Sequence, residues 1–386
     1  MLDKAAGGRS NSAPETGRVE VFWYVGPLAG FPAITGLEQA MSHPRRGIAV
    51  AGCWTCDYIF MCDRWPEEET LANIVGRDRG TGGAAYNCLL DLAKFGPPDG
   101  GAPIPLEGIG LVGDDPDGAR IRRDCRAHGI DDTALGTTAE ASTSFTNVIV
   151  VRGTGRRTFF HHRGANALFG PEHVPVERLG VRLLHLAYLL QMDRMDAPDA
   201  AYGTVAAGLL ARLQQAGIQT SIDVVSEAGD RFPRIVQPAL KYSHDVIVNE
   251  LEAGRTTGHD LRPGGRPDPQ AIRASAETLL AQGVERLVCI HMPEGAYLRT
   301  ADGRALWQPA LALPEGYIQA TTGAGDAFCA GMLLGIHEGW DLRRSLRLAV
   351  CAAARSLSRP GCTEACTSLA ETLALADQYA YQPAVM

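Results

Sequence analysis

From Gly47 onward, short apolar runs alternate with longer segments of helical periodicity. Strands that are buried on both faces read as continuous apolar runs, and they belong to parallel sheets whose connecting helices cover both faces. The alternation therefore predicts an α/β fold with a mostly parallel central sheet. The strand candidates are residues 47–52, 106–113, 182–187, 219–223, 245–249 and 286–290, and the helix candidates include 200–216 and 269–282.

One segment breaks this alternation. Residues 144–151 and 157–162 have strand character, and the turn between them contains glycine. This pattern is typical of a β-hairpin. Segments inserted into an α/β chain often cover a site, so we expect the hairpin to lie over one.

The charge balance limits the kinds of partner. The formal net charge is -8 and the pI is near 5.7, whereas nucleic acids and anionic membranes select surfaces with clustered excess cation. No run of about 18 apolar residues could span a bilayer, and the N-terminal residues lack the charged-then-apolar order of a secretory signal. We therefore expect a cytoplasmic protein with no nucleic-acid and no membrane partner.

Ten cysteines occur, and in a reducing compartment we expect most of them to be buried thiols. Cys53 and Cys56 have the spacing of a metal or redox pair, but on a strand their sulfurs point to opposite faces. Cys362 and Cys366 would converge on a helix, yet two ligands make only half a zinc site. We expect neither pair to bind a metal.

Two nucleotide-binding motifs can be set aside. Residues 108–113 match the glycine pattern of the dinucleotide fingerprint, but Ile109, Leu111 and Val112 continue a strand where the motif needs a turn into a helix. A Walker P-loop requires a Gly-Lys pair, and the sequence contains none. Neither mode of nucleotide binding is expected.

The stretch 320–333 combines a nearly bare backbone with one carboxylate. The Gly-Ala-Gly at 323–325 allows a tight turn with exposed N–H groups, and the apolar segment 327–336 predicts a buried helix whose positive end faces a site. Together these features form an anion hole suited to a phosphate. Asp326 would then stand where an incoming hydroxyl meets the phosphoryl group. The alternative, a carboxylate that only caps the helix, does not require the small residues before it.

Residues 321–328, Thr-Thr-Gly-Ala-Gly-Asp-Ala-Phe, closely resemble the C-terminal signature of the ribokinase-like (PfkB) family of sugar and nucleoside kinases. The resemblance implies that Asp326 is the base that accepts the proton of the acceptor hydroxyl. It also implies that the backbone of Gly323, Ala324 and Gly325 is the anion hole for the γ-phosphate. The implied fold is a three-layer α/β sandwich with a small β lid, and the implied cofactors are ATP and Mg²⁺.

Substrate-binding elements of that family also have counterparts in the expected order. Gly82, Gly83 and Asn87 match a motif that binds substrate hydroxyls, and Asp57 matches the sugar-binding aspartate. Read without the resemblance, the first is a plain turn into a helix, and Asp57 is a solvated surface charge.

Arg163 and Asn166 follow the hairpin, and the Gly-Ala-Asn that ends at Asn166 resembles a stretch near the substrate in relatives. Arg163 has two readings. Its guanidinium could hold a phosphate or an acidic sugar, or it could pair with a surface acid.

The nucleotide side also has counterparts in the family. Asn249 and Glu252 match an Asn-x-x-Glu element that acts through water on Mg²⁺ and the phosphates, although a polar helix start explains the same residues. Residues 352–361 resemble the helix and loop beside the nucleotide pocket. The residues expected at the nucleotide are Asn249, Glu252, His291, Gly295, Thr322, Gly323 and Gly325, with Glu252 as the Mg²⁺ residue.

The resemblance covers about residues 47–375, which we expect to form the kinase domain. Its lid strands are expected from about 57–80 and 143–163, and pairing of such strands between two chains would give a homodimer. Residues 1–46, rich in Gly, Pro, Ser and charge, are expected to be a loosely ordered extension, and 376–386 a C-terminal tail.

Three positions depart from the family pattern. Ala320 stands where potassium-activated relatives often have Asp, which argues against a monovalent cation as cofactor. His291 and Pro293 change a segment that borders the nucleotide, so a preference for ATP over other triphosphates is less firmly implied than phosphoryl transfer. Ala84 and Ala85 replace the Lys-Gly of ribokinase itself, which argues against ribose specifically.

We therefore expect ATP-dependent phosphorylation of a hydroxyl on a sugar or sugar-like molecule. A nucleoside kinase on the same fold is an alternative, and Trp54, Tyr58 and Phe160 are aromatic residues that could stack on a base. A catalytically idle regulator that binds a sugar or a nucleotide is a third reading, suggested by the altered segment 290–295.

Overall fold

In the computed structural model, residues 45–386 are described, so the extension expected over residues 1–46 lies outside the described residues except for its last two. The described residues cluster as one unit. Within them, no helix has both the length and the apolar character that a membrane crossing requires. The strands are β1 (Ile48–Gly52), β2 (Thr55–Cys62), β3 (Ile74–Gly82), β4 (Leu106–Gly113), β5 (Leu135–Thr138), β6 (Ser144–Val151), β7 (Arg157–His162), β8 (Leu183–Leu189), β9 (Pro198–Asp199), β10 (Gly203–Thr204), β11 (Gln219–Val224), β12 (Asp245–Asn249), β13 (Leu287–Met292), β14 (Gly295–Thr300) and β15 (Ala305–Pro309). The helices are α1 (Ala84–Phe95), α2 (Pro116–Ala127), α3 (Ala165–Leu168), α4 (Val205–Gln215), α5 (Phe232–Leu240), α6 (Glu250–Thr257), α7 (Pro269–Ala281), α8 (Ala324–Glu338), α9 (Leu342–Ser356), α10 (Leu369–Leu373) and α11 (Leu375–Gln378).

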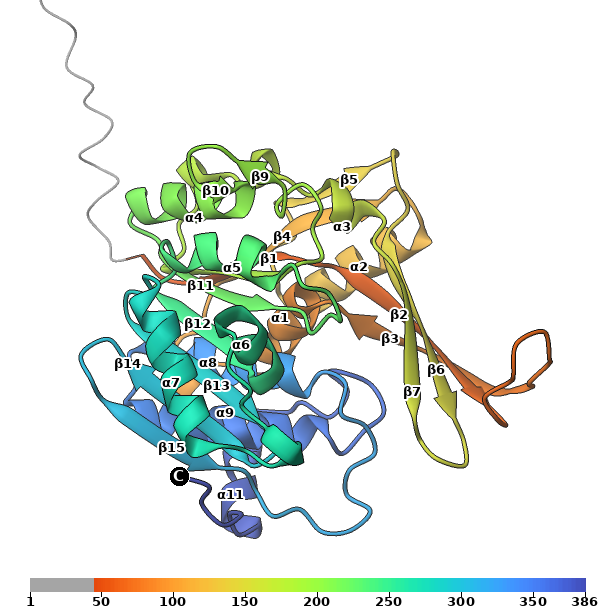
Figure 1. Cartoon of the computed structure of the whole chain (residues 1–386). Helices are drawn as coiled ribbons and strands as arrows, with labels where there is room; N and C mark the ends of the chain where they lie inside the picture. The colour runs from red at the N-terminus through yellow and green to blue at the C-terminus, as the bar shows by residue number, and fades with distance from the viewer. Residues whose placement is uncertain (1–44) are drawn as a thin grey trace, which may run out of the picture. The chain divides into compact units, whose positions relative to one another are not determined.

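The central sheet has nine strands in the order β15-β14-β13-β12-β11-β8-β1-β4-β5 (Figure 1). All six apolar runs predicted as strands belong to it, and they pair in parallel with one another. Strand β5 extends the parallel part at one edge, whereas β14 and β15 add antiparallel strands at the other. The prediction of a mostly parallel sheet is confirmed.

Helices cover both faces of this sheet and give three layers (Figure 1). Side chains of α1, α8 and α9 pack on one face together with Ile48 and Val50 of β1. Side chains of α4, α5, α6 and α7 pack on the other face with Ala49 and Ala51 of the same strand. All four β1 side chains have no exposed surface, because alternate residues of a strand face opposite layers and both layers are filled.

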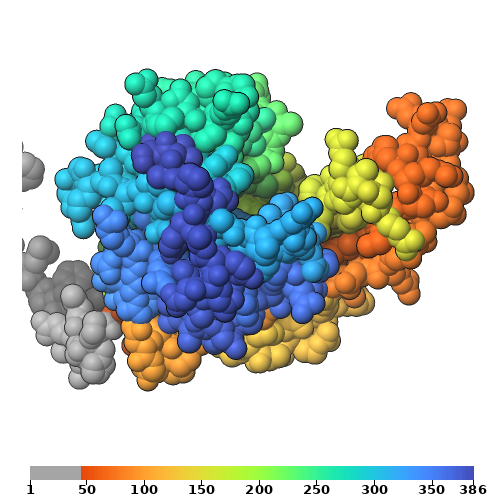
Figure 2. All heavy atoms as spheres, turned by 90° about the horizontal axis from the view of Figure 1, so that it is seen from below, coloured from red at the N-terminus to blue at the C-terminus, as the bar shows by residue number. Residues whose placement is uncertain are grey.

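A second sheet of four strands, in the order β3-β2-β6-β7, projects from the domain as an arm (Figure 2). The predicted hairpin is present, since β6 and β7 pair antiparallel from Phe145–His162 to Val150–Arg157. Strand β2 pairs antiparallel with β3 and in parallel with β6, so the arm joins both segments that were expected to supply lid strands. Several large apolar side chains on it are exposed, including Trp65 and Phe160. The expected pairing of two lids in a homodimer stays a prediction.

The packing of Trp54 at the root of this arm accounts for two glycines of the pattern at 108–113, Gly108 and Gly110. A Cβ on Gly108 or Gly110 of β4 would lie 2.7 or 2.3 Å from ring atoms of Trp54. The indole of Trp54 is fully buried, and its Nε1–H donates to the carbonyl oxygen of Ile109 at 2.9 Å. The pattern lies within a strand, as expected, and its first two glycines make room for an aromatic ring.

The remaining local predictions concern the cysteines and the C-terminal tail. All ten cysteines are free and buried, as expected for thiols that act as small apolar side chains. Residues 376–386, expected to be a tail, lie against the domain, since the N–H of Gln382 donates to Ala310 at 2.8 Å and Leu311 forms a bridge with Tyr381.

Candidate active site

A cavity of about 950 Å³ lies at the carboxyl ends of the central parallel strands. Residues that end or follow β1, β8, β11, β12 and β13 line it, as is usual for ligand sites of open α/β sheets. It brings together the following residues that the sequence singled out: Asp57, Gly82, Gly83, Asn87, Asn249, Glu252, His291, Gly295, Thr322, Gly323, Ala324, Gly325 and Asp326.

Asp326 lies in the first turn of α8 and is only 5% exposed. Its Oδ2 accepts a hydrogen bond of 2.7 Å from the side-chain amide of Asn87, and its Oδ1 accepts one of 3.1 Å from the hydroxyl of Tyr188. Both donors belong to other elements, so the carboxylate does not act as a simple helix cap. Burial, supported by the nearby carboxylate of Asp223, raises the pKa of Asp326 to about 6, although the hydrogen bonds oppose the shift. A carboxyl group with this pKa can accept a proton near neutral pH.

The backbone before Asp326 is held in a conformation that only glycine adopts readily. Gly323 has φ 83°, and a Cβ there would lie 2.7 Å from the Cα and the carbonyl oxygen of Cys362. The first intrahelical bond of α8 runs from the N–H of Ala327 to Gly323, so the amides before it are not used by the regular helix ladder. A helix N-terminus on the cavity wall provides a positive end suited to a phosphate.

Asp57 lies in β2 at the base of the arm and lines the same cavity. It is 7% exposed, which excludes the reading of a solvated surface charge. Burial raises the pKa of Asp57 to about 7, against a hydrogen bond from Thr146. A Cβ on Gly82 would lie 2.3 Å from Asp57 Oδ1, so this position must remain glycine to leave room for the carboxylate. Gly83 and Asn87 begin α1 beside it.

Asn249 and Glu252 form a reciprocal capping box at the start of α6. The side chain of Asn249 accepts from the N–H of Glu252 at 3.0 Å, and Glu252 Oε2 accepts from the N–H of Asn249 at 2.9 Å. The other oxygen of Glu252 accepts from Ser226 and from the Asn249 amide, each at 2.7 Å. Burial raises the pKa of Glu252 to about 8. The polar-helix-start reading therefore describes the contacts present, while both side chains also line the cavity.

His291 in β13 and Gly295 at the start of β14, both expected at the nucleotide, line the cavity, and their role stays a prediction. The imidazole of His291 packs on the ring of Phe328 with centroids 4.8 Å apart. Burial lowers the pKa of His291 to about 4, so the ring is neutral near pH 7. Ala320, where relatives often have an aspartate, is buried and outside the cavity lining.

Arg163 and Asn166 do not line the cavity. Arg163 forms an ion pair with Asp193, which is the surface-pair reading of the sequence. Asn166 is fully buried, and its side-chain oxygen accepts from the backbone N–H of Trp54 at 3.0 Å. Its amide group donates to Thr55 at 3.3 Å, so Asn166 ties the chain after the hairpin to the root of the arm.

The aromatic candidates for stacking on a base are arranged differently from the expectation. Trp54 is buried in the core, and the Tyr58 hydroxyl donates to Asp117 at 2.5 Å. Phe160 is exposed and stacks on Trp65 at 6.4 Å. None of these three candidates lines the cavity. Phe159, the residue before Phe160, does line it.

Arg157 is a candidate site residue that the sequence reasoning missed. It lies in β7, is partly buried, and its guanidinium donates to the hydroxyl of Thr322 at 2.7 Å. It lines a smaller cavity that shares Asp57, Thr322 and Cys362 with the large one. Within residues 45–386 no carboxylate lies within ion-pair distance of it, and no lysine or arginine lines the large cavity. Its place in the predicted hairpin was the only signal available.

Tyr188 and Asp223 were also missed, because their strands were predicted without any indication of which residues face a site. Tyr188 has φ 63° at the end of β8, and its N–H donates to Asp223 Oδ1 at 2.6 Å. Burial raises the pKa of Tyr188, so its hydroxyl keeps its proton and donates to Asp326. Tyr188, near the end of β8, therefore donates hydrogen bonds to two carboxylates that line the cavity, Asp223 and Asp326.

Comparison with known proteins identifies similar chains. A family model described as pfkB family carbohydrate kinase matches residues 46–369. The ATP-dependent ribose-1-phosphate kinase of Halopiger xanaduensis is 26% identical over 332 residues, which cover 85% of this chain and 98% of that protein. The adenosine kinase of Schizophyllum commune is 25% identical over 284 residues, with coverage of 69% and 75%.

Solved structures share the fold at low sequence identity. Arabidopsis thaliana ribokinase complexed with ribose and ATP superposes with a TM-score of 0.69 at 19% identity, covering 86% of this chain and 99% of that one. A nucleoside kinase of Methanocaldococcus jannaschii, an archaeal member of the ribokinase family, superposes with a TM-score of 0.62 at 18% identity, with coverage of 85% and 98%. The three-layer sandwich with a small separate sheet is thus an arrangement found in solved proteins.

Proposed function

The chain belongs to the pfkB family of carbohydrate kinases, and we propose that it transfers the γ-phosphoryl group of ATP to a hydroxyl group of a phosphorylated sugar. One observation carries the phosphoryl transfer. A buried carboxylate with a pKa raised to about 6, Asp326, lies directly after the Gly-Ala-Gly turn at the N-terminus of α8, on the wall of the main cavity.

In this proposal Asp326 accepts the proton of the attacking hydroxyl. Asn87 and Tyr188 hold its two oxygens, so the carboxylate is oriented before the acceptor arrives. The amides of the first turn of α8 stabilise negative charge on the transferring group at the same place. The base and the anion hole lie in one helical turn. This suits the reaction, because the acceptor oxygen loses its proton to the base and binds the phosphoryl group held by the anion hole.

The acceptor is held on the side of the cavity formed by the arm and α1. Asp57 accepts hydrogen bonds from sugar hydroxyls, and Gly82 and Gly83 leave room for the ring to approach the backbone. Asn249 and Glu252 also line the cavity and carry the oxygen atoms that Mg²⁺ prefers, and because these oxygens bond to neighbouring groups, contact with the ion through water suits them better than direct ligation. Mg²⁺, when bound, would neutralise charge on the phosphates, with Glu252 holding it through water.

The guanidinium of Arg157 supports an acceptor that itself carries a phosphate. It is the cationic side chain beside Asp57 and Thr322, and it has no carboxylate partner among residues 45–386. A guanidinium binds a phosphate group through paired hydrogen bonds. The 26% identity to a ribose-1-phosphate kinase along nearly the whole of that protein supports the same acceptor class.

A coupled assay for ADP formation tests this proposal with ribose-1-phosphate, ribose, fructose-1-phosphate and adenosine as acceptors. We expect turnover with phosphorylated sugars and a much higher KM for ribose. Arg157→Gln should raise the KM for the phosphorylated acceptor by about 10- to 100-fold, as expected for a lost charged hydrogen bond. The matched control is Arg163→Gln, which removes a nearby arginine that pairs with Asp193 and, unlike Arg157, lines neither the large cavity nor the small one beside it. Equal effects of the two variants would contradict the assignment of Arg157.

A nucleoside kinase is the second candidate, and Phe159 favours it. Its ring is 53% exposed and lines the cavity, so it could stack on a base. In the same assay, turnover of adenosine that falls by at least about tenfold in Phe159→Ala would support a nucleoside acceptor. An acceptor without a base should be little affected by that variant.

A further inference from the structure

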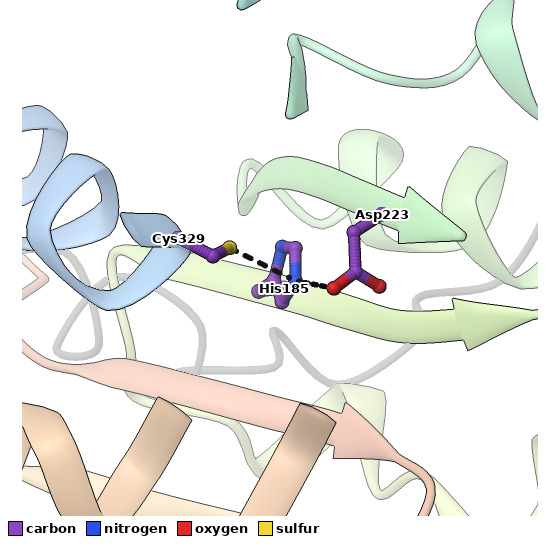
Figure 3. Close-up of side chains that lie close together, drawn as sticks. All are labelled: His185, Asp223 and Cys329. Atoms are coloured by element: carbon purple, nitrogen blue, oxygen red, sulfur yellow. Dashed lines mark hydrogen bonds and ion pairs between the residues drawn. The ribbon is translucent and has the colours of Figure 1, made fainter. Parts of the chain in front are cut away.

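Three buried side chains with metal-ligating atoms lie close together (Figure 3), and two of them, Asp223 and Cys329, line the main cavity. His185 lies in β8, Asp223 in β11 and Cys329 in α8, and one ligand atom from each lies within 4.8 Å of the others. His185 is fully buried, Cys329 is 2% exposed and Asp223 is 7% exposed. Three elements far apart in the sequence therefore place an imidazole, a carboxylate and a thiol at one point.

The other polar atoms of these groups are already engaged. His185 Nδ1 is paired with the hydroxyl of Ser221 at 3.0 Å, and Asp223 Oδ1 accepts the N–H of Tyr188 at 2.6 Å. This leaves Asp223 Oδ2 and the sulfur of Cys329 on two sides of His185 Nε2, both directed at it. Such outer hydrogen bonds are what fixes the tautomer and the orientation of metal-binding histidines and carboxylates.

The separations of His185 Nε2 from its two neighbours match those between two ligands of one zinc ion. Nε2 lies 3.5 Å from Asp223 Oδ2 and 3.5 Å from the sulfur of Cys329. The Nε2–H can point at only one of these two acceptors; 3.5 Å is a normal hydrogen-bond distance to the sulfur, but it is long for one to the oxygen of Asp223. In a tetrahedral zinc site, bond lengths of about 2.0 Å to N or O and about 2.3 Å to S place the ligand atoms roughly 3.3 to 3.6 Å apart.

We propose that His185, Asp223 and Cys329 bind a Zn²⁺ ion whose fourth position faces the cavity. A divalent cation with one carboxylate and one thiolate is electrically neutral, so the site avoids the cost of an uncompensated buried charge. Asp223 and Cys329 line the cavity, which gives the ion a route of access and leaves room for a water or a substrate oxygen as the fourth ligand.

The ligand set separates this site from that of Mg²⁺. Thiolate and imidazole ligands select zinc or a similar transition metal, whereas Mg²⁺ prefers oxygen ligands in octahedral geometry. The oxygens of Asn249 and Glu252 lie on β12 and α6, elements that supply none of the three zinc ligands. The zinc site would join β8 and β11 to α8, the helix that carries Asp326.

The test uses the full-length protein after removal of metal with a chelator and gel filtration. We expect one equivalent of Zn²⁺ to bind per chain, and Co²⁺ as a probe to give a thiolate-to-metal charge-transfer band with the visible absorption of a tetrahedral site. Cys329→Ser and His185→Ala should each abolish that band and weaken Zn²⁺ binding by more than about 100-fold, because even changes in outer hydrogen bonds cost 10- to 100-fold.

Cys289→Ser is the matched control, since Cys289 is also fully buried in a strand of the sheet and is not part of the cluster. It should retain both the band and the affinity. Asp223→Asn, which keeps the side-chain volume, supplies a third ligand variant, and circular dichroism confirms which variants are folded. Absence of a cobalt band in the wild type, or unchanged Zn²⁺ affinity in folded Cys329→Ser, overturns the proposal. Metal binding is read without turnover, so this outcome is separate from that of the kinase proposal.

Discussion

Replacement of Asp326 by asparagine tests the proposed chemistry most directly. The variant keeps the shape of the side chain but removes the group that accepts the proton. General-base assistance contributes about 10² to 10⁴ in rate, which corresponds to roughly 3 to 5 kcal/mol of barrier. We therefore expect kcat to fall by that factor.

The contacts of Asp326 indicate that the fold should tolerate this change. The carboxylate of Asp326 accepts two side-chain hydrogen bonds, one from the amide of Asn87 and one from the hydroxyl of Tyr188. The carboxamide oxygen can accept from Asn87 while the carboxamide N–H donates to the hydroxyl of Tyr188, so the loss is at most one hydrogen bond, about 1 kcal/mol. Removal of a 95% buried negative charge offsets part of this loss. The melting temperature should change by only a few degrees, and ATP binding should persist.

The pH dependence of kcat at saturating acceptor gives an independent check on Asp326. Burial raises the pKa of this group to about 6, and it is active when deprotonated. Turnover should thus be nearly complete at pH 7.5 and fall to about a tenth at pH 5, since one pH unit below the pKa leaves about 9% of the base. This acid limb should be absent from the residual activity of Asp326→Asn.

Two results would refute the reasoning about Asp326. One is an Asp326→Asn variant that keeps more than about a tenth of wild-type turnover. Its loss would then be less than about tenfold, whereas the loss of a general base should lower the rate by at least about 100-fold. The other is an acid limb near 6 that persists in the variant, because the titrating group would then be another residue. Asp91→Asn is the matched control, as Asp91 is a fully buried carboxyl group outside the cavity lining, and it should keep its turnover.

Further predictions concern the anion hole, a buried acid and the tyrosine beside the base. Gly323→Ala should lower kcat by more than about tenfold, because the new methyl group would lie 2.7 Å from backbone atoms of Cys362. Gly339, at the other end of α8, has a similar φ but open space around it. Gly339→Ala should therefore lower only the stability, by about 1 to 2 kcal/mol in thermal melting. Burial raises the pKa of Asp91 well above its usual value, so the cost of this acid to folding stability is absent below pH 4 and grows as the pH rises. Asp91→Asn should therefore raise the melting temperature more at pH 8 than at pH 4. An equal effect at both pH values would contradict this. Tyr188→Phe removes a hydrogen bond that lowers the pKa of Asp326, so the acid limb of kcat should move to higher pH.

The sequence predicted those parts of the fold that depend on local pattern. The run at 245–249 became β12 with the same bounds, and the hairpin strands 144–151 and 157–162 became β6 and β7. Asp326 was found because its chemistry and its glycines lie within a few consecutive residues. In each of these cases, short-range periodicity or spacing carries the information.

The site residues that the sequence missed depend on which strands become neighbours. Tyr188 reaches Asp223 because β8 and β11 pair in the sheet, although 35 residues separate the two in sequence. Arg157 reaches Thr322 across 165 residues, through the placement of the arm. Apolar periodicity shows that a strand is buried, but it does not show its neighbours or which polar residue will face a cavity.

The packing of Trp54 at the root of the arm has a mechanical consequence. Its backbone N–H is held by Asn166 and its indole by the carbonyl of Ile109, so the chain entering the arm at β2 and the chain leaving it after β7 are fastened at one point. The arm is then a lever with a fixed fulcrum. An eight-residue strand such as β2 is about 26 Å long, so a rotation of about 10° at this fulcrum carries its far end roughly 5 Å. Asp57, close to the fulcrum, would move only a small fraction of that distance, and the acceptor contacts would stay in place while the tip swings.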